Sequence, residues 1–303
     1  MQPAEERMTT TIAVTGASGQ LGYKIVEILA ANTAVQTIAL VRNPAKKTFA
    51  SNVEVRKFDY SDNASALTAA LSGVSAVILI SSNNVGSRFT EHKAVIDAAV
   101  SAGVKTVLYT SILNAETTVL KLASEHKQTE EYLAAQSSLK HVFLRNSWYT
   151  ENWTESIGGV LASSAVLGAS KDAQFSLATR NDYARASAAA AVRSVTGVGA
   201  LKEIYELGGV PVRPSEYAAE ISKHAGRTIV YKNFPEAEYV ALLTSFGLPA
   251  TFAEILADSD VGAAVGGLYV ETTDLVDLIG GQPEDWKVYV KEAVAHPPTA
   301  QSH

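Results

Sequence analysis

From about Thr10 onward, short runs of β-branched and apolar residues alternate with longer stretches in which apolar residues recur three and four positions apart. The short runs predict strands, and the three-and-four spacing predicts helices with one buried face. Their alternation is typical of a parallel sheet covered by helices, so the predicted class is α/β with a doubly wound parallel sheet. Strands are expected at 11–15, 37–41, 53–58, 76–80, 106–109 and 141–144, and helices at 21–31, 64–71, 91–102 and 124–135.

Beyond Asn146 the pattern loosens into segments rich in Gly, Ser and Ala. Strands are expected there at 174–177 and 204–207, and helices at 214–224 and 235–246. The run of small residues at 186–192 predicts a closely packed helix. We therefore expect a first domain over residues 9–150 and a smaller α+β domain over 151–296, from which some segments are free to return to the first sheet.

Composition and charge narrow the function classes. With 303 residues, 47% hydrophobic and 18% charged, the chain can bury a substantial core. A net charge of −6 gives no general attraction to nucleic acid or anionic membranes. The absence of cysteine excludes disulfides and thiolate chemistry. Residues 1–8 are polar, which indicates either a second start at Met8 or a non-native extension before it. Neither a signal sequence nor a membrane span is found, which predicts a cytoplasmic protein.

A glycine-rich turn follows the first expected strand and opens the first expected helix. It reads Thr-Gly-Ala-Ser-Gly-Gln-Leu-Gly over residues 15–22. Gly16 suits a tight turn, Gly19 lets the backbone approach a pyrophosphate, and Gly22 allows close packing of helix on sheet. Amides at the helix start then face the phosphates. The turn predicts a dinucleotide-binding Rossmann domain, with cofactor contacts from Gly16, Ser18, Gly19, Gln20 and Leu21.

The residues after the second expected strand indicate which dinucleotide is bound. NAD enzymes commonly place a carboxylate there for the ribose hydroxyls, whereas this chain has Arg42, with Lys46 nearby. A guanidinium removes repulsion from a 2′-phosphate and donates to it, so NADP(H) is the expected cofactor. The alternative is a solvated basic loop. Topology alone adds further candidates after strands three, four and five: Asp59, Tyr60, Ser81, Ser82, Thr110 and Ser111.

Other motifs limit the chemistry. No tyrosine among the twelve is followed four residues later by lysine, so the proton relay of ordinary short-chain dehydrogenases is absent. Hydride transfer to a quinone or a delocalised cation needs little acid catalysis and remains feasible.

Metal and hydrolase motifs are also absent. The six histidines form no metal-binding pair, and no G-x-S-x-G elbow occurs. Glu125, Glu130 and Glu131 are expected on a solvated helix face, and Phe234, Tyr239 and Phe246 in the core.

Several stretches together resemble the NmrA-like group of atypical short-chain dehydrogenases. The resemblance is nearest to type-2 NAD(P)H:quinone oxidoreductases and triphenylmethane reductases, and it covers the chain from Thr10 to about Ile279. It implies an NADPH-binding Rossmann domain, a small C-terminal domain and a substrate cleft between them. The motifs that carry it are the glycine turn, Val-Arg-Asn-Pro at 41–44, Tyr-Thr-Ser at 109–111, Leu-Arg-Asn-Ser-Trp-Tyr-Thr-Glu-Asn at 144–152 and Ala-Asp-Ser-Asp-Val-Gly at 257–262.

The resemblance also implies roles for residues outside the glycine turn. His126 falls where related reductases often carry a lysine, and Lys127 is the alternative if the alignment slips by one position. The implied catalytic residues are His126, Ser111 and Tyr149; Asn146 joins the cofactor residues, and Trp148 and Tyr149 line the acceptor site. The expected function is an NADPH-dependent reductase of a quinone-like or cationic aromatic acceptor. A nucleotide-sensing regulator without turnover, or a reductase of an activated carbonyl or alkene, is the alternative, and assembly as a homodimer stays open.

Overall fold

The computed structural model describes residues 10–298, so the polar N-terminal segment and the second start expected at Met8 lie outside the described residues. The chain divides into two compact units that interleave along the sequence. The first runs to Ser111 and also contains Gln128–Leu144 and Ala184–Tyr205. The second contains Ile112–Lys127, Arg145–Tyr183 and the residues from Glu206 onward. The domain boundary expected at residue 150 stays a prediction, and the chain does return to the first unit after that point.

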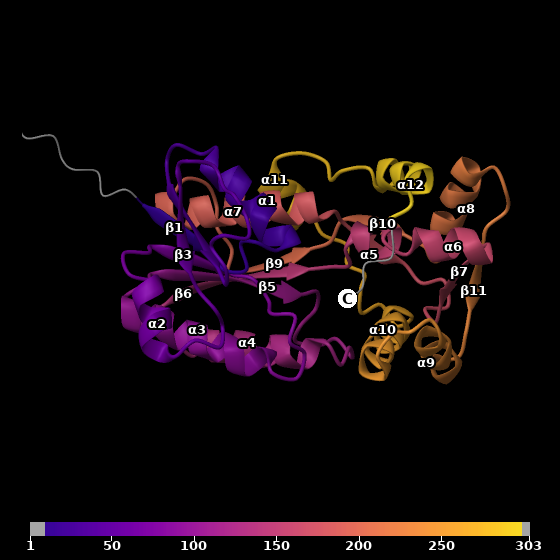
Figure 1. Ribbon diagram of the computed structural model, residues 1–303, viewed down its shortest axis with the longest axis horizontal. Helices are drawn as coiled ribbons and strands as arrows, with labels where there is room; N and C mark the ends of the chain where they lie inside the picture. Colours follow the sequence, from indigo (N-terminus) through magenta and orange to yellow (C-terminus); the bar gives the residue numbers. More distant parts are fainter. Residues whose placement is uncertain (1–9, 299–303) are drawn as a thin grey trace, which may run out of the picture. The chain divides into compact units, whose positions relative to one another are not determined.

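The first unit is built on a seven-stranded sheet with the strand order β3-β2-β1-β4-β5-β6-β9 (Figure 1). The pairs β1·β2, β2·β3, β1·β4 and β4·β5 are all parallel. This order reverses direction between β1 and β4, which makes the sheet doubly wound and confirms the predicted fold class. The strands are β1 (Thr11–Val14), β2 (Gln36–Val41), β3 (Val53–Lys57), β4 (Ala76–Leu79), β5 (Thr106–Ile112), β6 (Lys140–Asn146) and β9 (Ile204–Leu207).

Helices cover both faces of this sheet. In Figure 1, α1 and α7 lie on one face, and α2, α3 and α4 lie on the other. On the second face, the apolar sides of α2, α3 and α4 meet those of the central strands in a core that includes Ile38, Leu79, Ile96, Tyr109 and Leu133. The helices predicted at 21–31, 64–71, 91–102 and 124–135 are confirmed to within a few residues. The helices of this unit are α1 (Gln20–Ala30), α2 (Ala64–Ala70), α3 (Arg88–Ala102), α4 (Ala123–Ala134) and α7 (Arg180–Thr196).

The run of small residues at 186–192 lies inside α7, as expected for a closely packed helix. Ala186, Ser187, Ala190 and Ala191 have no exposed surface. Small side chains leave room for the helix backbone to approach the sheet. The helix is longer than the run, because Thr179 and Asp182 cap its first turn through reciprocal side-chain and backbone hydrogen bonds.

The second unit has its own core and two short sheets. Strands β10 and β8 pair antiparallel, and β11 and β7 pair parallel. Phe175, Tyr217 and Trp286 lie at the centre of the core. The elements are α5 (Thr150–Thr154), α6 (Ile157–Ser163), β7 (Ala165–Gly168), β8 (Phe175–Leu177), β10 (Val210–Val212), α8 (Pro214–Ala225), β11 (Val230–Asn233), α9 (Glu236–Ser245), α10 (Ala250–Ala263), α11 (Asp274–Ile279) and α12 (Trp286–Ala295).

Two expectations about side-chain burial are wrong. Phe246 is 60% exposed, because it follows the last turn of α9, a helix with no fully buried residue. Glu130 is only 5% exposed, because it lies on the side of α4 that also carries the buried Thr129 and Leu133. Within residues 10–298, no helix is both long enough and apolar enough to cross a membrane.

Candidate functional site

The glycine turn in the first unit forms a compact loop between β1 and α1. Gly16 has a φ of +58°, in the left-handed region that favours glycine. Its carbonyl oxygen accepts a hydrogen bond from the Gly19 amide at 2.9 Å. Gly19 is the N-cap of α1 and makes no side-chain cap, so the first amides of the helix receive no capping hydrogen bond from it. Such amides, together with the helix dipole, favour a bound phosphate.

Gly22 has a steric role in the same turn. A Cβ atom at this position would lie 2.9 Å from the Ala17 Cα and still closer to the Gly16 carbonyl oxygen. Backbone atoms cannot move away cheaply, so only glycine fits here. Of the other candidates in the turn, Ser18 and Gln20 are exposed while Leu21 is largely buried. Ser18 and Gln20 are thus available to a ligand, and Leu21 could contribute only its backbone.

A hydrogen-bonded group connects this turn to the end of β4. The Tyr60 hydroxyl lies 2.7 Å from both Thr15 Oγ1 and the Ile80 carbonyl oxygen. Thr15 Oγ1 accepts from the Ile80 amide at 2.9 Å and donates to the Ile78 carbonyl oxygen. Burial raises the pKa of Tyr60 well above its ordinary value, so it stays a neutral phenol. Its hydroxyl is engaged within the protein, which leaves the ring as the part of Tyr60 that can contact an adenine.

The basic residues predicted to read the 2′ position lie in the segment between β2 and β3. Arg42 and Lys46 are both exposed. Asn43 folds the segment into a turn, with its side chain accepting from the Ala45 amide at 3.0 Å and its carbonyl oxygen accepting from the Lys46 amide at 3.1 Å. Hydrogen bonds from the Ser61 amide and hydroxyl, with a smaller contribution from the Arg42 charge, lower the pKa of Asp59. Asp59 is therefore an anion near Arg42.

The polar residues that end β4 and β5 are interconnected. The Ser81 amide donates to Thr110 Oγ1 at 2.9 Å, and the Ser82 hydroxyl donates to the Glu91 carboxylate. The Ser111 hydroxyl oxygen is buried and has no hydrogen-bond partner among the described residues. An unsatisfied buried hydroxyl costs free energy, so this atom is a candidate for contact with a bound ligand.

His92 belongs to this group of residues, although the sequence did not single it out. Its side chain has no exposed surface. Nε2 accepts from the Ser82 amide at 2.9 Å, so the ring proton is on Nδ1, which lies 3.0 Å from Thr129 Oγ1. Burial, with a smaller effect from Arg88, lowers the pKa of His92 to about 3, so the ring is neutral. A lone histidine four residues into a helix gives no sequence signal for this role.

His126 and Lys127 are distinguished by burial in the second unit. His126 is 6% exposed on α4, whereas Lys127 is exposed. One step along a helix rotates a side chain by about 100°, so adjacent residues cannot face the same way. Of the two alternatives, His126 is therefore the buried one, and its role stays a prediction.

Asn146 and Tyr149 form a pair in the same unit. Asn146 Nδ2 donates to the Tyr149 hydroxyl at 2.9 Å, and Asn146 Oδ1 is buried without a partner among the described residues. The Tyr149 ring packs edge-on against Tyr183, with centroids 4.7 Å apart. Burial raises the pKa of Tyr149 to about 12, so its hydroxyl remains protonated at neutral pH. Trp148 is half-buried and packs against Phe175.

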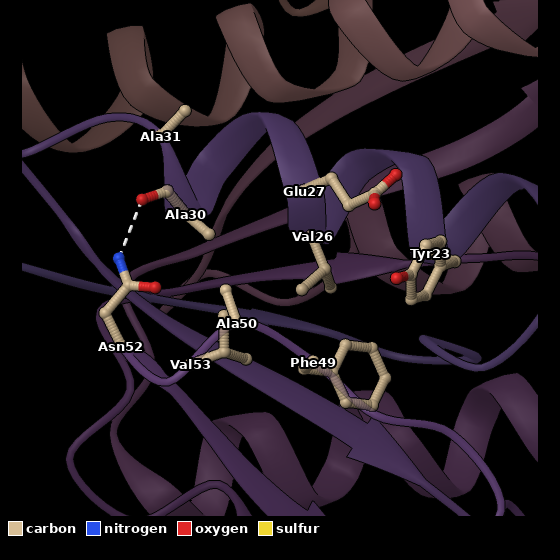
Figure 2. Close-up of a pocket in the computed structure, with 9 residues that line it drawn as sticks. All are labelled: Tyr23, Val26, Glu27, Ala30, Ala31, Phe49, Ala50, Asn52 and Val53. Atoms are coloured by element: carbon tan, nitrogen blue, oxygen red, sulfur yellow. Dashed lines mark hydrogen bonds between the residues drawn. The ribbon is translucent and has the colours of Figure 1, made fainter.

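Two further features of the described residues concern metal binding and a cavity. No group of three His, Cys, Asp or Glu residues within 10–298 is arranged to hold a metal ion. A cavity of about 350 Å³ lies between α1 and the residues just before β3 (Figure 2). None of the predicted site residues lines it.

The fold and the glycine turn agree with what is found when the chain is compared with known proteins. The model of the NmrA-like family matches residues 8–261. The chain belongs to the NmrA-like family. This confirms the resemblance inferred from the sequence motifs, and it agrees with a Rossmann sheet that carries a glycine turn after its first strand.

Several relatives of this NmrA-like chain are enzymes that align with it over most of both chains. Quinone oxidoreductase 2 of Escherichia coli strain K12 is 45% identical over 273 residues, which cover 89% of this chain and 93% of that protein. The crystal structure of the E. coli NADPH-dependent quinone oxidoreductase with NADPH has a TM-score of 0.84 and 42% identity, covering 94% of this chain and 99% of that one. Citrobacter triphenylmethane reductase with NADP(H) has a TM-score of 0.84 and 32% identity, covering 93% and 99%.

Proposed function

We propose that this chain is an NADPH-dependent reductase that passes hydride to a quinone-like or cationic aromatic acceptor. The observation that supports this best is the glycine turn with Arg42, in a chain 45% identical to quinone oxidoreductase 2 of E. coli. Two of the solved relatives carry NADPH or NADP(H) in their structures.

The residues of the first unit fit a dinucleotide. Gly16 and Gly22 keep the turn tight, and the amides at the start of α1 suit the pyrophosphate. The buried Ser111 oxygen, which has no partner among the described residues, suits a ribose or carboxamide group. Ser81, Ser82 and Thr110 hold the ends of β4 and β5 in place around it. When bound, the dinucleotide supplies a hydride from its reduced nicotinamide ring.

Arg42 and Lys46 give the preference for NADPH over NADH. Both are exposed cations on a turn that Asn43 organises. A guanidinium can donate two parallel hydrogen bonds to a phosphate, which NADH lacks at the 2′ position. Tyr60, with its hydroxyl already engaged, offers its ring to the adenine, and Asp59 lies beside Arg42.

We assign the acceptor to the aromatic residues of the second unit. Trp148 and Tyr149 present flat faces that suit a quinone or a triarylmethyl cation. Tyr149 is a neutral phenol held by Asn146, and without a neighbouring lysine relay its hydroxyl is a hydrogen-bond donor rather than a base. Its role is therefore to orient the acceptor.

The proton balance identifies a place for His126. Reducing a quinone to a hydroquinone takes one hydride, which carries two electrons, and one proton. A cationic dye needs the hydride alone. We assign His126 as the source of this proton, which makes His126 more important for quinones than for cationic dyes.

Stopped-flow oxidation of NADPH in the presence of a panel of quinones and triphenylmethane dyes tests this proposal. We expect oxidation that depends on the acceptor, with NADPH strongly preferred over NADH. Tight NADPH binding without oxidation by any acceptor would favour a regulator that senses the nucleotide. Turnover limited to activated carbonyls or alkenes, identified by product mass, would change the substrate class.

Two further expectations remain predictions. A homodimer is tested by light scattering on the purified protein, and the cytoplasmic location by fractionation of cells.

A further inference from the structure

The cavity in Figure 2 marks where the segment between β2 and β3 attaches to α1. The segment comprises residues 42–52 and contains no helix. Tyr23 and Val26 of α1 lie on one side of the cavity, and Phe49 and Ala50 lie on the other. The complete lining is Tyr23, Val26, Glu27, Ala30, Ala31, Phe49, Ala50, Asn52 and Val53.

Tyr23 makes two contacts with this segment. Lys47 Nζ lies 3.8 Å from the centre of the Tyr23 ring, the arrangement of a cation–π contact. The Phe49 ring lies 5.6 Å from the Tyr23 ring at an angle of 39°. Both partners follow Arg42 and Lys46 in the chain and precede β3, so Tyr23 attaches the middle of the segment to α1.

Few other features order this segment. From Arg42 to Ala50 every residue is exposed except Phe49, which is half-buried. The Asn43 turn orders the start of the segment, and Asn52 Nδ2 donates to the Ala30 carbonyl oxygen at 2.8 Å near its end (Figure 2). An exposed segment without such attachments would lose conformational entropy when it closes on a ligand.

We propose that Tyr23 is a specificity-determining positioning residue, which holds the segment carrying Arg42 and Lys46 in place for the 2′-phosphate through its contacts with Lys47 and Phe49. The inference rests on the proposed function, because it concerns the NADPH site. The Lys47 ammonium is occupied by the Tyr23 ring, so its contribution is to attach the segment. Because the Tyr23 ring makes both contacts, the inference requires the ring and not the hydroxyl.

Binding of NADPH and NADH to the Tyr23→Ala and Tyr23→Phe variants tests the inference. A single cation–π contact or aromatic pair is worth about two- to tenfold in an equilibrium, and the segment keeps its other attachments when the Tyr23 ring is removed. Tyr23→Ala should therefore raise the Kd for NADPH about two- to tenfold and leave the Kd for NADH unchanged. Tyr23→Phe should keep the wild-type ratio, because the ring is retained. Neither substitution changes the charge of the protein.

A matched control exists in the same unit. Lys93 and Phe89 contact Tyr132 as Lys47 and Phe49 contact Tyr23, at 4.7 Å and 6.0 Å from its ring centre. Tyr132 lies on α4 and Lys93 on α3. Tyr132→Ala should leave the ratio of the dissociation constants for NADPH and NADH unchanged.

Phe49→Ala repeats the test at a half-buried position if Tyr23→Ala does not fold. It should weaken the binding of NADPH and leave the binding of NADH unchanged.

The outcomes separate this inference from the proposed function. Wild-type protein that binds neither nucleotide would overturn both. Wild-type protein that prefers NADPH, with the same preference in Tyr23→Ala and Phe49→Ala, would overturn the role of Tyr23 alone. An equal loss of both nucleotides in Tyr23→Ala, or a Tyr23→Phe variant that behaves like Tyr23→Ala, would also overturn it.

Discussion

His92 Nε2 accepts a hydrogen bond at 2.9 Å from the amide of the buried Ser82, in the segment that follows β4. The bond requires a ring without a proton on Nε2, and the surroundings enforce this by lowering the pKa of His92 to about 3. The loop that carries Ser81 and Ser82 is thus held by a neutral histidine, and its stability depends on that neutrality.

Acidification should therefore destabilise the protein through His92. In the unfolded chain its pKa is near 6.5, so between about pH 6.5 and 3 the unfolded state binds more protons than the folded state. Stability is complete above about pH 6.5 and falls as the pH falls towards 3, by up to about 1.4 kcal/mol per pH unit from this residue. His92→Gln keeps an acceptor and a donor without titrating. Urea unfolding at several pH values gives the free energy of unfolding as a function of pH. Below about pH 6.5 this free energy should fall less steeply in His92→Gln than in the wild type, and equal pH dependence would contradict the assignment.

Gly22→Ala should disrupt the glycine turn. Its Cβ would overlap backbone atoms of Gly16 and Ala17, and an overlap of this kind costs about 2–3 kcal/mol. The exposed Gly159, inside α6, has no atom within 4 Å of a built Cβ. Gly159→Ala should stabilise its helix by about 0.5–1 kcal/mol. Thermal unfolding should show a lower melting temperature, and NADPH titration weaker binding, in Gly22→Ala and not in Gly159→Ala. Wild-type stability in Gly22→Ala would mean that the turn is not as tight as described.

Arg42→Ala should weaken NADPH far more than NADH. A hydrogen bond to a charged group contributes about 1.5–3 kcal/mol, which corresponds to roughly 10- to 150-fold in Kd. NADH has no 2′-phosphate and should bind the variant as it binds the wild type. Isothermal titration with both nucleotides measures the difference, and equal losses would show that Arg42 does not read the 2′ position.

Hydride transfer to a quinone needs little acid catalysis, so His126→Ala should lower kcat for quinones by less than the roughly 10²-fold of a full general acid, and leave kcat for cationic dyes unchanged. Lys127→Ala serves as the comparison, because Lys127 is exposed and His126 is buried. Steady-state rates with a quinone and with a cationic dye separate proton transfer from hydride transfer, since only the quinone needs a proton. A larger loss in Lys127→Ala would reverse the assignment.

The strands and helices of the first unit follow from local patterns. The segment 11–15 and the helix after it were predictable because β-branched runs, glycine positions and apolar periodicity act over a few residues. The same is true of the glycine turn, since Gly16 and Gly22 are dictated by backbone angles and steric room close in sequence. Arg42 could be found because its position relative to the turn is fixed by one β-α-β unit.

The buried network around His92 could not be found in this way. Ser82, His92 and Thr129 meet only because β4, α3 and α4 pack together, and none of these residues has a local motif. The burial of Glu130 and the exposure of Phe246 likewise depend on which side of a helix meets a neighbour, which weak amphipathicity in α4 and α9 did not reveal.

The sequence alone determined the family and the doubly wound sheet, because motifs and the strand–helix alternation recur along most of the chain. It also predicted the glycine turn, whose spacing lies within residues 15–22. Tertiary structure decided which polar groups are engaged within the protein and which are left for a ligand. Tyr60, His92 and Tyr23 owe their roles to neighbours 10 to 45 positions away. Hydrogen bonds and ring contacts between distant residues exist only once the hydrophobic core has brought their elements together, and no local pattern records them.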